Sequence, residues 1–296
     1  MKTSLILVPY HLGIGHVSMG LGPERILQAG INDALSSQGH DVKVETIRRQ
    51  TGAVQDELAT IAEINTILAG HVRKALKQGR FPLVLAGNCN ACLGTLAGID
   101  AQTVGIVWLD AHGDFNTPET SLSGFLDGMP LAMAAGLCHR TVLRISGSPP
   151  IHGAHIIHVG GRDFDRGEQE RLVEHQILVV PASHLRQVGL AMALGPALAA
   201  LRSRVQHVYL HVDLDVLDPA EGRANQHTPP DGLSRRDLKG AIRMIGAELN
   251  INAAALTAYD PAWDESGHAL GAGLQVIHTI VEAAATPQST RGAVQA

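Results

Sequence analysis

Aromatic residues and cysteines are scarce in this sequence, and both shortages exclude classes of protein. Phe, Trp and Tyr make up only 3% of the 296 residues, so we expect no aromatic platform on which bases or sugars could stack. Three cysteines are too few for a disulfide framework in a chain of this length. This cysteine usage is typical of a reducing compartment, and we expect a cytoplasmic protein.

Basic clusters and long apolar runs are missing as well. The net charge is -5 and the lysines and arginines form no block, so nucleic acid is not expected as a partner. No apolar run approaches the roughly 20 residues of a membrane span, and the N-terminal run is too short for a signal peptide. Hydrophobic residues make up 45% and charged residues 17%, which indicates a folded chain with a large core and no membrane partner.

Short apolar runs alternate with stretches of helical periodicity along the chain. Buried strands are expected at residues 3–9, 42–47, 81–86, 103–109, 155–159, 177–180, 208–212 and 253–258. Helices are expected at residues 23–37, 55–78, 128–137, 168–175, 194–202, 235–249 and 268–285. This alternation predicts an α/β fold with a parallel sheet covered on both faces. With no linker in sight, we expect one domain over residues 1–296, with a frayed tail from 286.

Two acidic motifs follow buried strands, at the sheet edge where ligands bind in such folds. Asp110, His112 and Asp114 stand at alternate positions, so in an extended chain they point to one side. Asp213 and Asp215 repeat the design. A single motif of this kind is usually a turn or a helix cap. Two of them favour a metal site, because cations relieve the repulsion between packed acids.

The composition of this set also indicates which metal it would hold. Oxygen ligands with one imidazole suit manganese better than structural zinc, which favours thiolates. Carboxylates shared between two ions could place them close together, and such a pair lowers the pKa of a water molecule between them. We therefore predict a pair of manganese ions held by the two motifs.

These motifs resemble the two metal signatures of the ureohydrolases, the family of arginase, agmatinase and formimidoylglutamase. Asn116-Thr117-Pro118 and residues 162–168 are similar to arginase in particular. The resemblance covers nearly the whole chain. It implies a three-layer αβα fold with a mostly parallel sheet, two Mn²⁺ ions, a homotrimer or homohexamer, and hydrolysis of C–N bonds in linear amidines.

The resemblance also implies a role for each metal-site residue. Asp110 and Asp213 would bridge the two ions. Asp114 would complete one site, and His112 with Asp215 would complete the other.

The same resemblance implies an amino-acid substrate. Asn116 and Ser123 match positions that hold the substrate α-carboxylate in arginases, although an interpretation as ordinary loop residues stays open. Asp165 matches the residue near the α-amino group, with Glu168 in support.

Three positions depart from the family pattern. The usual Gly-Gly-Asp-His turn reads Gly87-Asn88-Cys89-Asn90, which puts Asn90 in place of a histidine ligand, as a weaker and uncharged donor. The Gly-x-Leu-His-Gly loop ends here in Leu126-Asp127-Gly128, so Asp127 stands near the scissile group and could move a proton. Ala258 replaces the carboxylate that grips the guanidinium.

The leading hypothesis is therefore a manganese-dependent hydrolase of a guanidino or amidino C–N bond in an arginine-like amino acid. Arginine itself or an N-hydroxylated arginine would fit, and Asp127 or Asp114 would deliver a proton to the leaving amine. Two alternatives stay open. One is a catalytically weak homologue that binds an amino acid or acts as a regulatory subunit. The other is a metal-dependent amide hydrolase on the same fold.

Overall fold

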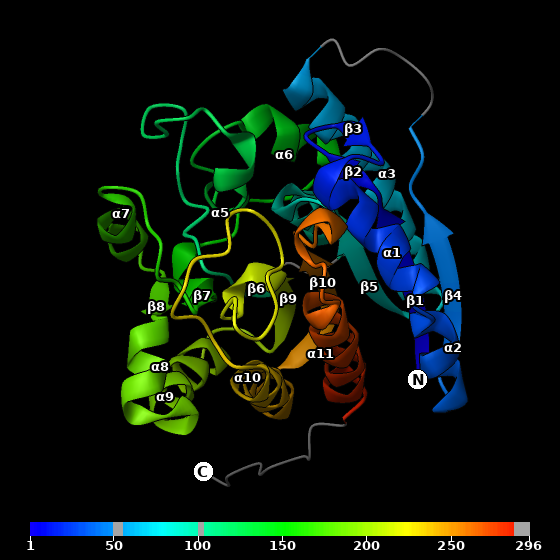
Figure 1. Cartoon of the computed structure of the whole chain (residues 1–296). Coiled ribbons are helices and arrows are strands. Elements are labelled where there is room, and N and C mark those ends of the chain that lie inside the picture. Colours follow the sequence, from blue (N-terminus) through cyan, green and yellow to red (C-terminus); the bar gives the residue numbers. More distant parts are fainter. Residues whose placement is uncertain (50–55, 100–103, 287–296) are drawn as a thin grey trace, which may run out of the picture.

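The computed structural model describes residues 1–49, 56–99 and 104–286. Within them, eight parallel strands form one sheet in the order β4-β1-β5-β10-β9-β6-β7-β8 (Figure 1). The strands are β1 (Lys2–Val8), β4 (Asp41–Thr46), β5 (Phe81–Ala86), β6 (Val104–Leu109), β7 (Ile156–Val159), β8 (Leu178–Val180), β9 (His207–Asp213) and β10 (Asn250–Thr257). A small antiparallel hairpin pairs β2 (Tyr10–His11) with β3 (Ile14–Gly15).

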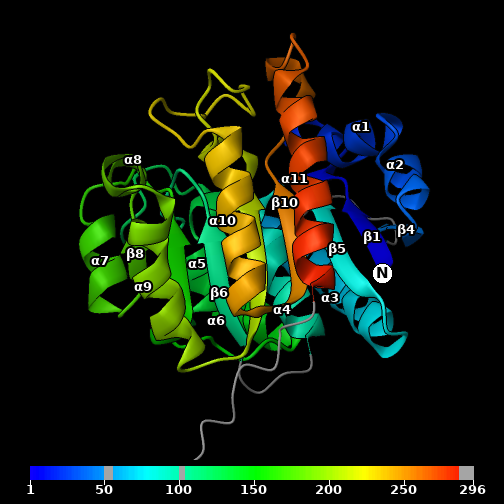
Figure 2. The ribbon, with the colours of Figure 1, turned by 90° about the horizontal axis from the view of Figure 1, so that it is seen from below.

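Helices cover both faces of the sheet. They are α1 (Gly22–Gln28), α2 (Ile31–Ser37), α3 (Glu57–Lys77), α4 (Cys92–Gly98), α5 (Pro130–Ala134), α6 (Arg140–Ser146), α7 (Glu168–Glu174), α8 (Ala182–Val188), α9 (Leu190–Arg202), α10 (Arg235–Glu248) and α11 (His268–Ala285). In Figure 2, α10 and α11 stand side by side in front of the sheet while α3 and α4 lie behind it. The predicted three-layer αβα fold is confirmed. No helix in the described part of the chain is long and apolar enough to cross a membrane.

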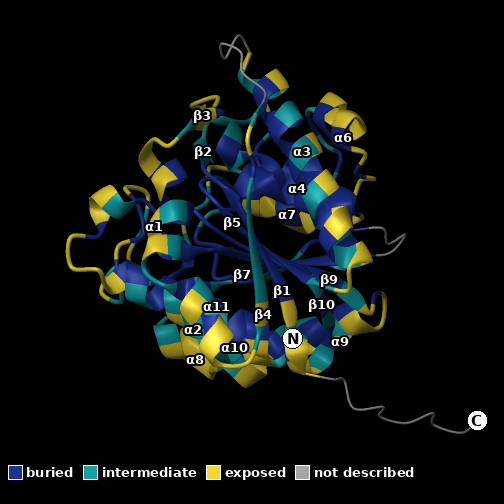
Figure 3. Cartoon of the chain, turned by 90° about the vertical axis from the view of Figure 1, so that its right-hand side faces the viewer, coloured by how far each residue is buried: buried dark blue, intermediate teal, exposed yellow. Residues whose placement is uncertain are grey.

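Strand β6 shows how one sheet builds two cores. Val107 and Leu109 belong to the core that packs under α9, α10 and α11. Ile106 and Trp108 belong to the core under α3, α4 and α6, because successive side chains of a strand point to opposite faces. Figure 3 shows buried strands at the centre and exposed residues on the outer sides of the helices.

Several helix boundaries differ from the sequence prediction for local reasons. The helix expected over residues 23–37 is two helices, because Gly30 has a φ of 86° and separates α1 from α2. The helix expected over 128–137 shortens to α5. Helices α6 and α8, of seven residues each, were not expected. Of the predicted frayed tail, residues 287–296 lie outside the described chain.

The strand order creates a place for a ligand. The chain passes from β5 to β6, which lies three positions along the sheet, and later inserts β9 and β10 between them. The loops after β5 and β6 therefore diverge at the carboxyl edge, and this is where α/β sheets bind ligands.

Candidate active site

A cavity of about 190 Å³ opens at this edge of the sheet. The predicted site residues that line it are Asp110, His112, Asp114, Asn116, Ser123, Asp127, Asp165, Glu168, Asp213 and Asp215. Asn90 is described by the structure but lies outside this lining. The lining also contains Cys89, Asn225, His227 and Ala258, to which the sequence analysis assigned no positive role.

The first acidic motif leaves β6 as a tight turn. Asp110 is buried, and its Oδ1 accepts a hydrogen bond from the His112 N–H at 2.8 Å. Its Oδ2 accepts one from Trp108 Nε1 at 3.0 Å. Asp114 has a φ of 49°, a left-handed conformation that few residues other than glycine adopt. This bend lets the chain turn back over the strand end within four residues.

The second motif meets the first through His112. Its Nδ1 lies 3.4 Å from Asp215 Oδ2 and 3.5 Å from Asp110 Oδ1. Asp213 Oδ1 accepts a hydrogen bond from the Asp215 N–H at 2.8 Å. Asp215 Oδ2 accepts a longer one, of 3.3 Å, from Asn225 Nδ2. Carboxylates from two strands that are far apart in sequence thus face one imidazole.

Two oxygens of this cluster lack a partner. Asp114 Oδ2 and Asp215 Oδ1 are buried and receive no hydrogen bond from any residue that the structure describes. Buried anionic oxygens without partners are costly, so this donor set fits a divalent cation. Asp110, His112 and Asp215 each offer one ligand atom, and these atoms lie within 4.8 Å of one another.

The pKa shifts in this cluster also indicate a cation site. Burial and the neighbouring Asp110 raise the pKa of Asp114 well above its ordinary value. Burial and the neighbouring Asp215 do the same to the pKa of Asp213. Burial alone would lower the pKa of His112, but the carboxylates of Asp215 and Asp110 outweigh it and raise that pKa. Asp114 and Asp213 therefore bind protons more tightly than free carboxyl groups do, whereas His112 lowers the pKa of Asp215, and a metal ion would compete with these protons.

The turn after β5 puts Cys89, and not Asn90, in the cavity wall. The Cys89 thiol donates to Asp213 Oδ2 at 3.0 Å. Asn90 instead donates to Asp127 Oδ1, with its N–H at 3.0 Å and its side-chain amide at 3.3 Å. The structure keeps Asn90 out of the cavity lining and so does not support the expectation that it is a metal ligand. If Gly87 is the second glycine of the Gly-Gly-Asp-His turn, residues 86–89 read Ala-Gly-Asn-Cys, and Cys89 then stands at the histidine position.

Asp127 holds this turn in place. Its Oδ2 accepts hydrogen bonds from Asn88 Nδ2 and from the Cys89 N–H, the latter at 3.2 Å. Its Oδ1 accepts the two from Asn90. Burial raises the pKa of Asp127 to about 6, although these donors oppose the shift. With both oxygens occupied, Asp127 fits a positioning role for Cys89 better than the predicted transfer of a proton.

The predicted substrate residues lie around the rim. Asn116 Nδ2 donates to Asp165 Oδ2 at 2.7 Å, and Asn116 Oδ1 accepts from Arg171 at 2.8 Å. Ser123 is exposed, and its Oγ accepts a hydrogen bond from the Phe125 N–H at 3.2 Å. The cavity lining thus includes an amide, a hydroxyl and a carboxylate.

Glu168 fastens the rim to the first acidic motif. Its carboxylate is buried and accepts hydrogen bonds from the Phe115 N–H at 2.8 Å and the Asp165 N–H at 3.0 Å. A Cβ at Gly113 would collide with this carboxylate, so the motif needs glycine there. Glu168 therefore holds the backbone at Asp165 next to the first acidic motif.

Three residues near the cavity escaped the sequence analysis. His211 stands two positions before Asp213 on β9, and this spacing alone indicates that it shares a face with Asp213. Asn225 and His227 come from the long loop after β9, where no regular pattern marks them. The His227 ring lies 6.0 Å from that of Phe125, and both residues line the cavity.

Comparison with known proteins identifies the family. The sequence model of the arginase family matches residues 1–282. The chain belongs to the arginase family. It is 33% identical to arginase of Bacillus caldovelox over 274 residues, which cover 88% of this chain and 92% of that relative. The crystal structure of Bacillus subtilis arginase matches with a TM-score of 0.86 at 28% identity, over 97% of this chain and 99% of that one.

The wider superfamily shares the fold at lower identity. Formimidoylglutamase of Bacillus subtilis is 19% identical and has a TM-score of 0.76, over 95% of this chain and 86% of that one. The resemblance to the ureohydrolases is therefore confirmed, and with it the expected class of enzyme, a hydrolase of C–N bonds in linear amidines. Asp127 and Ala258, two positions where the sequence departs from the expected family pattern, line this cavity together with Cys89.

Proposed function

We propose that this arginase-family chain hydrolyses a guanidino or amidino C–N bond of an arginine-like amino acid. One observation carries the proposal. The cavity joins buried carboxylates with unpartnered oxygens, on Asp114 and Asp215, to a polar rim that contains Asn116 and Asp165. A metal centre for hydrolysis and a binding surface for an amino-acid head group thus open into one space.

Divalent ions are required for this function. Asp110, His112 and Asp215 would hold one ion, and Asp114 with Asp213 would contribute to a second. Oxygen donors with one imidazole suit Mn²⁺, which we propose for the position at His112. Such ions supply the activation of water near neutral pH. A homotrimer or homohexamer stays a prediction from the family.

The rim would bind the substrate's amino-acid end. Asp165 would attract the α-amino group, and its hydrogen bond with Asn116 fixes the position of its carboxylate. The side-chain amide of Asn116 and the hydroxyl of Ser123 are donors suited to the α-carboxylate. A plain amine such as agmatine, which lacks the α-carboxylate, would forgo these contacts.

The other end of the cavity favours a less basic substrate. Ala258 lines the wall where the family carries a carboxylate, so a guanidinium there loses a charged hydrogen-bond acceptor. An N-hydroxyguanidine is less basic than a guanidine and depends less on such a partner. We therefore propose an N-hydroxylated or otherwise modified arginine, ahead of arginine itself. Asp114, with its unpartnered oxygen, is the better candidate for proton delivery to the leaving amine.

A substrate panel tests this function. The Mn²⁺-loaded protein would be assayed with arginine, N-hydroxyarginine, agmatine and other guanidino acids, by release of the urea-type product and of the amine. We expect the highest kcat/KM for N-hydroxyarginine and the lowest for agmatine. Ala258→Glu should shift the preference toward arginine. Equal rates for agmatine and the amino acids would contradict the assignment of the rim.

The same panel separates the alternatives. A catalytically weak homologue would bind metal and amino acid but release no product from any substrate. An amide hydrolase would leave every guanidino compound intact and cleave simple amides. Product release that persists in the variant Asp110→Asn would show that the activity does not arise from this centre.

A further inference from the structure

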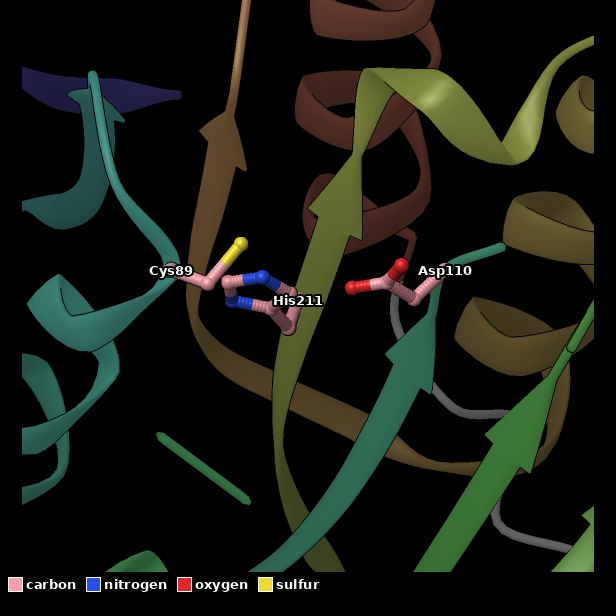
Figure 4. A group of neighbouring side chains, drawn as sticks. All are labelled: Cys89, Asp110 and His211. Atoms are coloured by element: carbon pink, nitrogen blue, oxygen red, sulfur yellow. The ribbon is translucent and has the colours of Figure 1, made fainter. Parts of the chain in front are cut away.

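A second set of metal-capable side chains lies deeper in the sheet than His112. Cys89, Asp110 and His211 each offer one ligand atom, and the three atoms lie within 4.8 Å of one another. Figure 4 shows them coming from three elements, the turn after β5, the end of β6 and the middle of β9. All three residues are buried. The set shares Asp110 with the outer set of Asp110, His112 and Asp215, so one carboxylate can serve both.

The His211 ring is held in a fixed orientation. It stacks on the Trp108 indole with a centroid separation of 3.5 Å and an interplanar angle of 6°. Its Nδ1 lies 2.8 Å from the Tyr209 hydroxyl, which fixes the rotation of the ring. With Nδ1–H donating to that hydroxyl, Nε2 carries the lone pair of the ring, and its neighbour is the Thr257 hydroxyl at 3.3 Å. An outer partner on one nitrogen is the usual arrangement of a histidine that binds metal through the other.

The remaining contacts bring a thiol to the same point. The Thr257 hydroxyl lies 3.3 Å from His211 Nε2 and 3.3 Å from Cys89 Sγ. The imidazole nitrogen and the thiol therefore lie on either side of one hydroxyl group. Cys89 Sγ is also 3.0 Å from Asp213 Oδ2. Asp110 has further capacity, because each of its oxygens accepts one hydrogen bond and has a second lone pair.

We propose that the second ion of this centre, to which Asp213 would contribute, is bound at this inner position by Cys89 and His211, with Asp110 shared between the ions, so that the inner position selects a thiophilic ion such as Zn²⁺ or Co²⁺ over Mn²⁺. Thiolate and imidazole donors favour these ions, whereas oxygen donors suit Mn²⁺. On binding, the Cys89 thiol loses its proton to solvent and a bond forms between Sγ and the ion. The centre then holds two different metals. This inference rests on the proposed function only in placing both ions in one cavity.

Cobalt absorption tests the thiolate directly. The full chain loaded with one equivalent of Co²⁺ should show a thiolate-to-cobalt charge-transfer band in the near ultraviolet. Cys89→Ser should abolish the band, while Cys92→Ser, which removes another buried thiol three residues away, should retain it. A wild-type spectrum without the band, or an equal band in Cys89→Ser, would overturn the proposal.

Metal competition tests the selectivity. After dialysis against equimolar Zn²⁺ and Mn²⁺, we expect one tightly held Zn²⁺ per wild-type chain. Cys89→His restores the family's histidine and should change the Zn²⁺-to-Mn²⁺ ratio at least tenfold toward Mn²⁺. If Cys89→Ser fails to fold, as judged by circular dichroism, Cys89→His replaces it as the variant that removes the thiol. An unchanged ratio in a folded Cys89→His variant would count against the thiolate.

X-ray absorption tests the imidazole. With one equivalent of Zn²⁺, the wild type should show one sulfur neighbour at about 2.3 Å and an imidazole at about 2.0 Å. His211→Gln should lose the imidazole signal and bind Zn²⁺ at least tenfold more weakly, while the control His207→Gln on the same strand keeps both. An unchanged spectrum in His211→Gln would remove His211 from the ligand set.

None of these measurements uses a substrate. If no guanidino compound is hydrolysed but the cobalt band depends on Cys89, the proposed function fails and the metal assignment stands. If substrates are hydrolysed and the band is absent, the metal assignment fails alone.

Discussion

Replacing Asp127 by asparagine should remove a large pH-dependent term from the stability of the metal-free protein. Burial raises the pKa of this carboxyl from 3.8 to about 6 in the folded chain. Because the folded pKa is the higher one, its stabilising effect is fully present below pH 3.8 and is lost as the pH rises through about 6. At 1.36 kcal/mol per unit the loss totals about 3 kcal/mol, of which about 2 kcal/mol falls between pH 4.5 and 7.5.

The asparagine also lowers the free energy of unfolding in a second way. It has one acceptor oxygen where Asp127 uses two, so its amide must face either the Asn88 and Cys89 donors or those of Asn90. Two buried donors then lose their acceptor, at about 1–3 kcal/mol each. We expect Asp127→Asn to be less stable than the wild type, with a deficit that is about 2 kcal/mol smaller at pH 7.5 than at pH 4.5.

Urea unfolding with a chelator present measures this effect. The informative quantity is the difference in free energy of unfolding between variant and wild type at each pH, since groups that titrate alike in both proteins cancel. Asp33→Asn, at an exposed position, is the matched control and should show no such trend. A difference that stays constant within about 0.5 kcal/mol from pH 4.5 to 7.5 would refute the argument that burial acts on this carboxyl.

Three further predictions concern the same cavity. Asp110→Asn should reduce hydrolysis to background, with the fold retained by circular dichroism, because both proposed ions lose their shared ligand. Glu168→Gln should lower the free energy of unfolding by about 1–3 kcal/mol and raise KM more than it lowers kcat, since one of two backbone N–H groups loses its acceptor. Saturation with Mn²⁺ at about 100 times its Kd should add about 2.7 kcal/mol and raise Tm by roughly 4 °C in calorimetry, and an unchanged Tm would contradict a folded-state metal site.

The sequence predicted the fold well because its signals are local. The two strands that lead into the site at residues 81–86 and 104–109 are continuous apolar runs, which mark strands buried on both faces. The predictions that differed from the structure concern helices that apolar periodicity did not mark. Gly30 breaks one helix through its φ of 86°, and α6 and α8 are only seven residues long.

The site was predicted only in part, and the turn after β5 shows why. One residue of register in a turn decides which side chain enters the cavity, and no periodicity fixes the register of a turn. Cys89 enters because Asp127 receives the N–H groups of both Cys89 and Asn90. That anchor lies 37 residues or more along the chain, so the turn by itself gives no sign of it.

The sequence by itself determined the alternation of strands and helices, and it determined that Asp110, His112, Asp213 and Asp215 follow buried strands. Both facts depend on neighbours within a few residues. Only the tertiary structure decided that β10 and β9 lie between β5 and β6, which brings Cys89 within hydrogen-bond distance of Asp213, 124 residues away. Strand order is set by how the helices and both cores pack together, and that packing belongs to the chain as a whole.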